Sequence, residues 1–284
     1  MRRILRKIGL LTILFFLTFT LVASNGIAHH QKVINTAQFN SCLNDISASC
    51  LIIPKPTTSP TPITPFTPDP QLNEQQRFLT TIAIKLPTVP QPGTFEYILL
   101  RKYGAPFINQ QAETKLPLKV LFANEKETKE FQSTLAMIKV NNTNDCYLQQ
   151  SAGLALNKAR TLQNIPLKSG YGSGDCTRTF TTNLRFWYKY ANSRTLDKVR
   201  QGKETAILGI VAPPGSSQHL WGLAIDLRVS SFKQRQALNQ NGWFQTVEND
   251  IPHWTYLGLT EEKLPLFGFK KQVVRGITYW ITPI

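Results

Sequence analysis

The chain has 284 residues, of which 42% are hydrophobic and 17% are charged. This apolar content excludes a wholly disordered chain, and a single hydrophobic run at the start excludes a membrane protein with many spans. Lysine and arginine outnumber aspartate and glutamate by 32 to 17, which gives a formal net charge of +15 and favours acidic partners. These numbers indicate a basic globular protein with an N-terminal export or anchor segment.

Residues 1–24 are predicted to be a signal peptide or an N-terminal membrane anchor. Four basic residues precede an uncharged stretch over 8–22, which is typical of secretory signals and short for a span of about 20 residues. Without this segment the net charge is still +11, which suits an anionic cell-wall surface, although general solubility explains it equally well. No RNA-binding motif points to nucleic acid. We expect an exported protein of the cell envelope.

The chain divides into a tether and one folded domain. Residues 25–53 form a short extracytoplasmic segment without a functional signal. Residues 54–71 are rich in proline and threonine, which predicts an extended, semi-rigid linker. A single folded domain then occupies residues 72–284.

The four cysteines suggest disulfide bonds, because their number is even in a chain that is predicted to be exported. They are Cys42, Cys50, Cys146 and Cys176. Three pairings are possible, of which Cys42 with Cys50 and Cys146 with Cys176 matches the domain division. Free buried thiols are the alternative.

Short helices and strands are expected to alternate within 72–284. In chain order the patterns predict helices over 125–140 and 147–162, a strand over 165–171, a glycine-rich turn over 170–174, a helix through 180–190 and a closing strand over 279–281. In the second helix, Leu148, Ala152, Leu156 and Ala159 recur every three or four residues. Asp175 could cap the helix that follows the turn.

The segment 216–229 is the most informative part of the chain. Apolar residues at every second position from Leu223 to Val229 predict a strand with one apolar face. Asp226 therefore lies on the other face, next to the small residues Gly222 and Ala224. Small residues that lead to a carboxylate suggest the floor of a site.

The histidines point to a metal. The chain has only four, His29 and His30 beside the export segment and His219 and His253 in the domain. With Asp226, the latter two supply three zinc ligands and leave the fourth position to water, as in catalytic zinc sites. A structural zinc site would normally close with four ligands that include cysteine, which this spacing does not offer.

Asp250 is the candidate general base. Pro252 excludes a regular helix, so a turn must bring Asp250 and His253 to one cavity. The Asp250 carboxylate could then take a proton from the water that the metal activates and pass it to the leaving amine. Glu248 is a weaker candidate for the base. Taken alone, Asp250 could simply form a turn, and each histidine could simply be a hydrogen-bonded core or surface residue.

Together these residues form a known pattern. The fixed positions of a complete SxHxxGxAxD motif are Ser217, His219, Gly222, Ala224 and Asp226. Residues 250–254 are similar to the partner motif DxPHW, and the chain resembles the zinc-dependent peptidoglycan peptidases related to VanY D-alanyl-D-alanine carboxypeptidases over about 147–258. The resemblance implies zinc ligands His219, Asp226 and His253, the base Asp250, and a small α+β fold with an antiparallel sheet flanked by helices around a zinc cleft.

The resemblance also implies substrate-binding residues, and here the chain departs from the family. The candidate substrate-binding residues are Tyr171, Ser173, Arg178 and Ser217, of which Arg178 is not part of the family pattern. The family usually has arginine directly after the tyrosine, where this chain has Gly172. Arg178 could reach back into the cleft in its place, or it could be a solvated helix residue.

The substrate expected from the resemblance is a peptidoglycan stem peptide, and the reaction is that of a D-alanyl-D-alanine carboxypeptidase. Asp250 is more familiar in L-alanyl-D-glutamate endopeptidase relatives, so an endopeptidase is the alternative, and an inactive wall-binding module is a second. A serine enzyme is disfavoured, because Ser230 and Lys233 follow the Lys-Ser-Gly at 168–170 in the wrong order.

Overall fold

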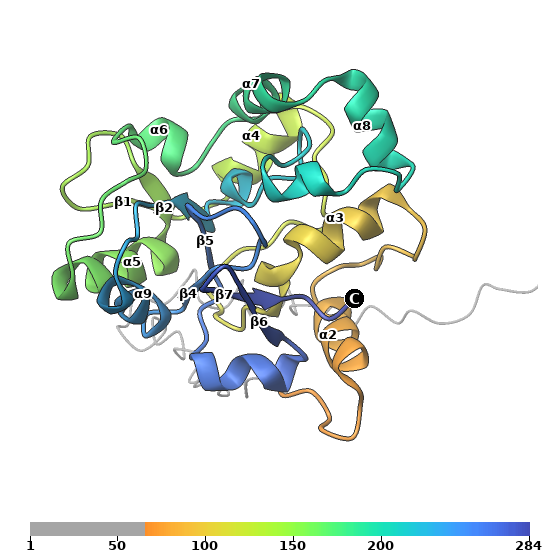
Figure 1. Cartoon of the computed structure of the whole chain (residues 1–284), viewed down its shortest axis with the longest axis horizontal. Helices are drawn as coiled ribbons and strands as arrows, with labels where there is room; N and C mark the ends of the chain where they lie inside the picture. Colours follow the sequence, from red (N-terminus) through yellow and green to blue (C-terminus); the bar gives the residue numbers. More distant parts are fainter. Residues whose placement is uncertain (1–65) are drawn as a thin grey trace, which may run out of the picture. The chain divides into compact units, whose positions relative to one another are not determined.

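The computed structural model describes residues 66–284 and confirms the α+β class, with helices around small antiparallel sheets (Figure 1). The predicted export segment 1–24, the segment 25–53 with Cys42 and Cys50, and most of the linker 54–71 lie outside these residues. Within 66–284, no helix combines the length and the apolar character that crossing a membrane requires.

The elements are short. The α-helices are α2 (Glu74–Ala83), α3 (Phe95–Tyr103), α4 (Glu125–Ser133), α5 (Gln150–Leu162), α6 (Gly172–Asp175), α7 (Phe180–Tyr190), α8 (Ser193–Arg200) and α9 (Phe232–Asn239). The 3-10 helices are η1 (Ala105–Ile108), η2 (Ala206–Gly209), η3 (Gln218–Trp221) and η4 (Glu261–Phe267). The strands are β1 (Met137–Lys139), β2 (Tyr147–Gln149), β3 (Ala224–Asp226), β4 (Trp243–Phe244), β5 (His253–Tyr256), β6 (Lys270–Val274) and β7 (Ile277–Ile281).

A three-stranded antiparallel sheet lies at the centre, in the order β3-β5-β4. Every residue of these strands is buried, as expected of a sheet covered on both faces. Ile225 pairs with Trp254 and Asp226 pairs with His253. The pairing therefore brings two residues that are 27 positions apart in sequence side by side at one end of the sheet.

The sheet is enclosed by helices and by a second small sheet. The hairpin β1-β2 packs against α5, and α5 packs against α9, which Figure 1 shows beside the central strands. Helix α4 contacts η3 and α7. Four tryptophans, Trp187, Trp221, Trp243 and Trp254, are among the largest fully buried side chains of the described core.

The C-terminal hairpin β6-β7 confirms the closing strand predicted over 279–281, which lies within β7. The preceding η4 packs against α2, and the Phe78 and Phe269 rings meet edge to face with centroids 5.7 Å apart. Gly268 has φ +88°, and a Cβ there would lie 2.1 Å from the Glu74 carbonyl oxygen. Only glycine allows this close approach.

Two predicted helices are too long at the ends that face each other. The helix predicted over 125–140 stops at Ser133, and the one predicted over 147–162 begins at Gln150. The segments 137–139 and 147–149, which lie between these two helices, form the paired strands β1 and β2 instead, with Ile138 opposite Leu148. Leu148 is buried, as its place in the apolar pattern indicates. Its four-residue spacing to Ala152 does not require one continuous helix, because a strand that runs into a helix can give the same spacing.

The predicted strands and cap also need correction. In place of a strand over 165–171 the structure has one isolated bridge, between Leu167 and Leu227, and the strand predicted over 223–229 is reduced to β3. Asp175 does not cap the following helix. Thr179 does, since its side chain accepts a hydrogen bond from the Thr182 amide.

Candidate active site

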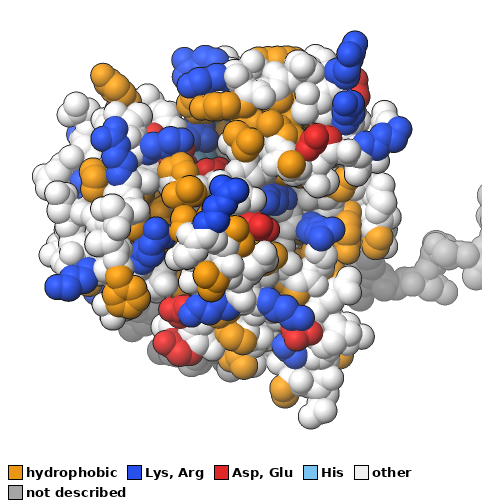
Figure 2. Space-filling model, in the orientation of Figure 1, with side chains coloured by type: hydrophobic (Ala, Val, Ile, Leu, Met, Phe, Trp, Pro, Cys, Tyr) orange, Lys and Arg blue, Asp and Glu red, His pale blue; other side chains and the backbone are white. Residues whose placement is uncertain are grey.

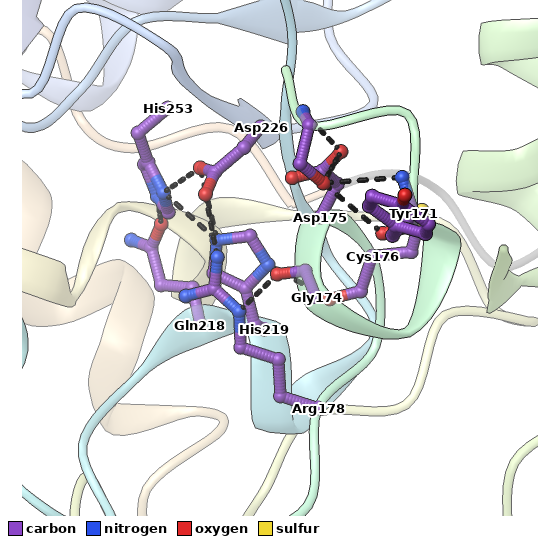
Figure 3. A network of polar contacts seen from close by, with 10 residues as sticks. Tyr171, Gly174, Asp175, Cys176, Arg178, Gln218, His219, Asp226 and His253 are labelled. Atoms are coloured by element: carbon purple, nitrogen blue, oxygen red, sulfur yellow. Dashed lines mark hydrogen bonds and ion pairs between the residues drawn. The ribbon is translucent and has the colours of Figure 1, made fainter. Parts of the chain in front are cut away.

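The three predicted metal ligands come from three elements, η3, β3 and β5. Asp226 ends β3 and His253 begins β5 directly opposite. His219 lies on η3, which ends at Gly222 with φ +68° before the chain enters β3. This left-handed turn folds η3 back over the strand. Figure 3 shows the three side chains pointing toward one another.

The ligand atoms are close enough to share one metal ion. His219 Nε2 lies 3.3 Å from Asp226 Oδ1, and His253 Nδ1 lies 3.6 Å from the same oxygen. An ion with ligand bonds of about 2.0–2.2 Å separates tetrahedral ligand atoms by about 3.3–3.6 Å, and both distances lie in that range. The two ring nitrogens are slightly closer, 3.1 Å apart.

The hydrogen bonds of the two rings strengthen this fit. His219 Nδ1 donates to the Cys176 carbonyl at 2.8 Å, and His253 Nε2 donates to Gln218 Oε1 at 2.8 Å. A neutral imidazole has one N–H, so the nitrogens that face Asp226 carry lone pairs. Three acceptors that converge within 3.6 Å repel one another unless a cation lies between them. The donor set of two imidazoles and one carboxylate is that of a catalytic zinc site.

Electrostatics keep the ligands in their metal-binding forms. Burial, together with the Arg178 charge, lowers the pKa of His219 to about 4, so the ring is neutral at pH 7. Burial alone would raise the pKa of Asp226, but His219 and Arg178 outweigh it and hold that pKa well below its ordinary value. The carboxylate is therefore ionised.

Arg178 lies in the cleft and not, as the alternative held, in solvent on a helix. It precedes α7, and its side chain is 12% exposed. Its Nη2 donates to Asp226 Oδ2, its Nε donates to the Gly174 carbonyl, and its guanidinium stacks on the Phe186 ring at 4.7 Å. Asp226 therefore offers one oxygen to the histidines and the other to Arg178.

Gly172 explains why the family arginine is absent from its usual position. A Cβ at this residue would lie 2.3 Å from the carbonyl oxygen of Asp145 and 2.4 Å from the Cys146 nitrogen. No side chain fits there. The chain segments come this close beside the disulfide between Cys146 and Cys176, which the structure contains as predicted, with a Cα separation of 5.4 Å.

Asp250 faces the same cavity as the three ligands. The turn that Pro252 requires is closed by the His253 amide, which donates to the Asp250 carbonyl at 3.1 Å, and Asn249 adopts φ +71° within it. Burial raises the pKa of Asp250 to about 6, with Asp226 adding to the shift and His253 and Lys168 opposing it. A carboxyl group with a pKa near 6 can both accept and release a proton close to neutral pH, which suits it to proton transfer.

The predicted substrate-binding residues are divided by the structure. Ser217 and Arg178 line the cavity. Tyr171 is 77% exposed, and neither it nor Ser173 is part of the cavity wall. At the end of α6, Asp175 accepts hydrogen bonds from the Ser169 amide and hydroxyl.

Several lining residues were not predicted from the sequence. The cavity is also lined by Asn183, Phe186, Tyr190, Ile210, Val211 and Ala212. Lys168 and Gln218 also line the cavity. Asn183, Phe186 and Tyr190 recur at helical spacing, which marks one face of α7 but does not say what that face meets. Gln218 occupies a variable position inside the SxHxxGxAxD motif, so no pattern singled it out.

Residues 154–259 match the family model described as VanY: D-alanyl-D-alanine carboxypeptidase. The predicted resemblance is confirmed for this segment, which holds the three converging ligands and Asp250 and spans less than half of the chain. No curated protein matches the chain. Among solved structures, it is distantly similar to the vancomycin resistance D,D-dipeptidase VanXYg in complex with a D-Ala-D-Ala phosphinate analog, with 13% identity over 49% of this chain and 69% of that one and a TM-score of 0.31.

Proposed function

We propose that this protein is a zinc peptidase that hydrolyses peptidoglycan stem peptides, acting as a D-alanyl-D-alanine carboxypeptidase. One observation carries the proposal: three lone pairs from His219, Asp226 and His253 converge in a cavity that also holds Asp250. The match to the VanY family over 154–259 supplies the substrate class.

These three side chains would hold the ion. When bound, zinc supplies a Lewis acid that activates water and polarises the scissile carbonyl. The chain contributes two imidazole rings, each fixed by a hydrogen bond on its far nitrogen, and one carboxylate held by Arg178. Such outer contacts orient the ligands.

Asp250 would move the proton. Its carboxylate takes a proton from the attacking water as the carbon–oxygen bond forms, and it returns that proton to the departing amine as the carbon–nitrogen bond breaks. The pKa of about 6 keeps the group mostly ionised at neutral pH while leaving it basic enough to accept.

Lys168 favours an anionic peptide end over an internal bond. It lines the cavity beside Asp226, whose carbonyl accepts from the Lys168 amide at 2.9 Å. Arg178 lines the cavity as well, but its guanidinium is already paired with Asp226. The terminal carboxylate of a stem peptide is the substrate group that Lys168 would attract.

The charge of the chain is consistent with work at the cell wall. The net charge is +15, and Figure 2 shows lysine and arginine side chains spread over the face in view, with fewer acidic ones. We include in the proposal that the protein is exported through the segment 1–24, either cleaved or retained as a membrane anchor, and acts in the envelope on an anionic polymer.

Product analysis tests the proposal. The metal-loaded protein is incubated with a pentapeptide stem ending in D-Ala-D-Ala, with the same peptide amidated at its C-terminus, and with purified peptidoglycan fragments. Mass spectrometry should show loss of one D-alanine from the free acid, abolition by a chelator and recovery with zinc.

Other outcomes identify the alternatives. Cleavage between L-alanine and D-glutamate would make the protein an endopeptidase. Zinc binding without cleavage would indicate a wall-binding module. Cleavage that needs no zinc but is blocked by penicillin would point to a serine enzyme, although Ser230 and Lys233 lie outside the cavity wall.

A further inference from the structure

Gln218 is a buried glutamine whose hydrogen bonds are all made inside the protein. Its side chain is 1% exposed. Its Nε2 donates to the Tyr103 carbonyl at 2.7 Å, and its Oε1 accepts from Thr255 Oγ1 at 2.6 Å and from His253 Nε2 at 2.8 Å. Gln218 therefore links a metal ligand to two other parts of the fold.

The Tyr103 contact fixes which way the amide points. A carbonyl can only accept, so the amide nitrogen must face Tyr103 and the amide oxygen must face His253. That oxygen in turn requires a proton on His253 Nε2. The remaining ring nitrogen, Nδ1, then has a lone pair directed at the partner ligands, 3.6 Å from Asp226 Oδ1.

A chain of hydroxyls reinforces this direction. Thr255 Oγ1 donates its proton to Gln218, so it accepts from Thr246 Oγ1, 2.8 Å away. Both threonines are buried, at 0% and 3% exposure. These hydrogen bonds have one consistent set of donors and acceptors. Reversing the Gln218 amide would break several of them at once, so the observed orientation is favoured.

The support for Gln218 begins outside the residues that match the family. Tyr103 ends α3, well before residue 154, and its hydroxyl donates to the Leu208 carbonyl at 2.8 Å. Tyr103 is itself buried. The carbonyl of Tyr103, in the N-terminal part of the domain, therefore orients the Gln218 amide that contacts His253.

We propose that Gln218 is a positioning residue that selects the Nε2–H tautomer of His253 and thereby creates the third metal-binding lone pair. This inference rests on the zinc site of the proposed function but does not depend on which bond is cut. Outer contacts of this kind change metal affinity by about 10–100-fold when removed.

Metal affinity measured by competition with a chromogenic chelator tests the proposal without any peptidase assay. Gln218→Met keeps the length of the side chain and removes the acceptor, so zinc affinity should fall by about 10–100-fold. Gln218→Glu keeps an acceptor for His253 but loses the donor to the Tyr103 carbonyl, so it should retain more zinc affinity than Gln218→Met while lowering the melting temperature.

Gln149 provides a matched control. It is also a buried glutamine, 2% exposed, whose Nε2 donates to the Lys115 and Trp221 carbonyls, but it contacts no metal ligand. Gln149→Met should lower the melting temperature by a similar amount and leave zinc affinity unchanged. Equal losses of affinity in both variants would show that Gln218 serves stability alone and would overturn the proposal.

The tautomer can be observed directly in the metal-free protein. Nitrogen-15 NMR of the His253 ring should show protonated Nε2 in the wild type and a mixture of tautomers in Gln218→Met. If Gln218→Met does not fold, Thr255→Val provides the same test with a smaller expected loss, about two- to fivefold in zinc affinity. A wild-type ring protonated on Nδ1 would contradict the inference, whatever the enzyme cleaves.

Discussion

Asp226 has two tasks at the residue scale. Its Oδ1 faces His219 and His253, and its Oδ2 accepts from Arg178. A carboxylate shared in this way cannot rotate freely, which fixes the direction of its metal-facing oxygen. The same arginine lowers the pKa of His219 and Asp226, so one cation favours a neutral His219 and an ionised Asp226, the forms that the proposed zinc site requires.

Replacing one ligand should remove the metal. His219→Ala leaves two of three protein ligands, so we expect the zinc content to fall from about one equivalent to near zero. Metal analysis after dialysis measures this. Asp250→Asn, which changes no ligand, should retain one equivalent, and equal zinc in His219→Ala and the wild type would refute the assignment.

Replacing the base should spare the metal and abolish most turnover. Asp250→Asn cannot accept the proton from water, so kcat should fall by about 100-fold or more. Glu248→Gln is the matched control, because Glu248 lies outside the cavity that holds the ligands. We expect this variant to be nearly silent in a D-alanine release assay. Normal turnover in Asp250→Asn would assign the proton transfer to another group.

The convergence of His219, Asp226 and His253 was predictable because histidine is scarce in this chain and the motif positions have a fixed spacing. Gln218 was not, since a buried amide and an exposed one look the same in a sequence. Gly172 was recognised only as a departure from the family pattern. Its cause is a close approach to Asp145 and Cys146, which follows from the fold and not from local sequence.

At the scale of elements, the site depends on strand pairing more than on strand length. The strand predicted over 223–229 is longer than β3, yet its alternation correctly placed Asp226 on the face opposite Ile225. The partner strand β5 begins at His253. No local pattern gives the register that sets Asp226 opposite His253, because pairing partners 27 residues apart are chosen by tertiary packing.

The disulfide should affect stability and substrate binding but not metal content. The bond between Cys146 and Cys176 spans 30 residues and lies beside α6, and the Cys176 carbonyl also accepts from His219. Replacing both cysteines by serine should cost about 3–4 kcal/mol on chain-entropy grounds. We expect a lower melting temperature and a higher KM.

The controls for this prediction separate the bond from the site. Zinc stoichiometry in the Cys146→Ser, Cys176→Ser double variant should stay near one equivalent, because the ligand side chains come from other elements. Peptide mapping without reduction should recover the linked pair from the wild type. Free thiols at both positions in the native protein would show that the bond does not form.

At the scale of the whole molecule, composition and the motif were sufficient for the fold class but not for how the domain closes. Helix α2 packs on η4, and the Arg77 guanidinium donates to the Pro265 carbonyl, 188 residues away. Such contacts join the two ends of the described domain. A sequence pattern indicates the period of an element and which of its faces is buried. It does not indicate which distant element covers that face.

The raised pKa of Asp250 has a consequence for the stability of the whole domain. In the metal-free protein this group has a pKa of about 6 in the folded state, against about 3.9 when unfolded. Between these values the folded state binds more protons, so this group makes the free energy of unfolding fall as pH rises through that range. The buried Asp250 carboxyl group therefore lowers the free energy of unfolding at neutral pH.

Asp250→Asn should remove this weakening. The neutral amide has no charge to bury, so the variant should gain stability over the wild type as pH rises, by about 1–2 kcal/mol between pH 4.5 and pH 8. Urea unfolding of both proteins with a chelator present measures the difference. Gln149→Met changes no ionisable group and should differ from the wild type by a constant amount over the same range. A constant difference for Asp250→Asn as well would show that Asp250 is ionised in the folded state at pH 4.5, in conflict with the burial that the structure gives it.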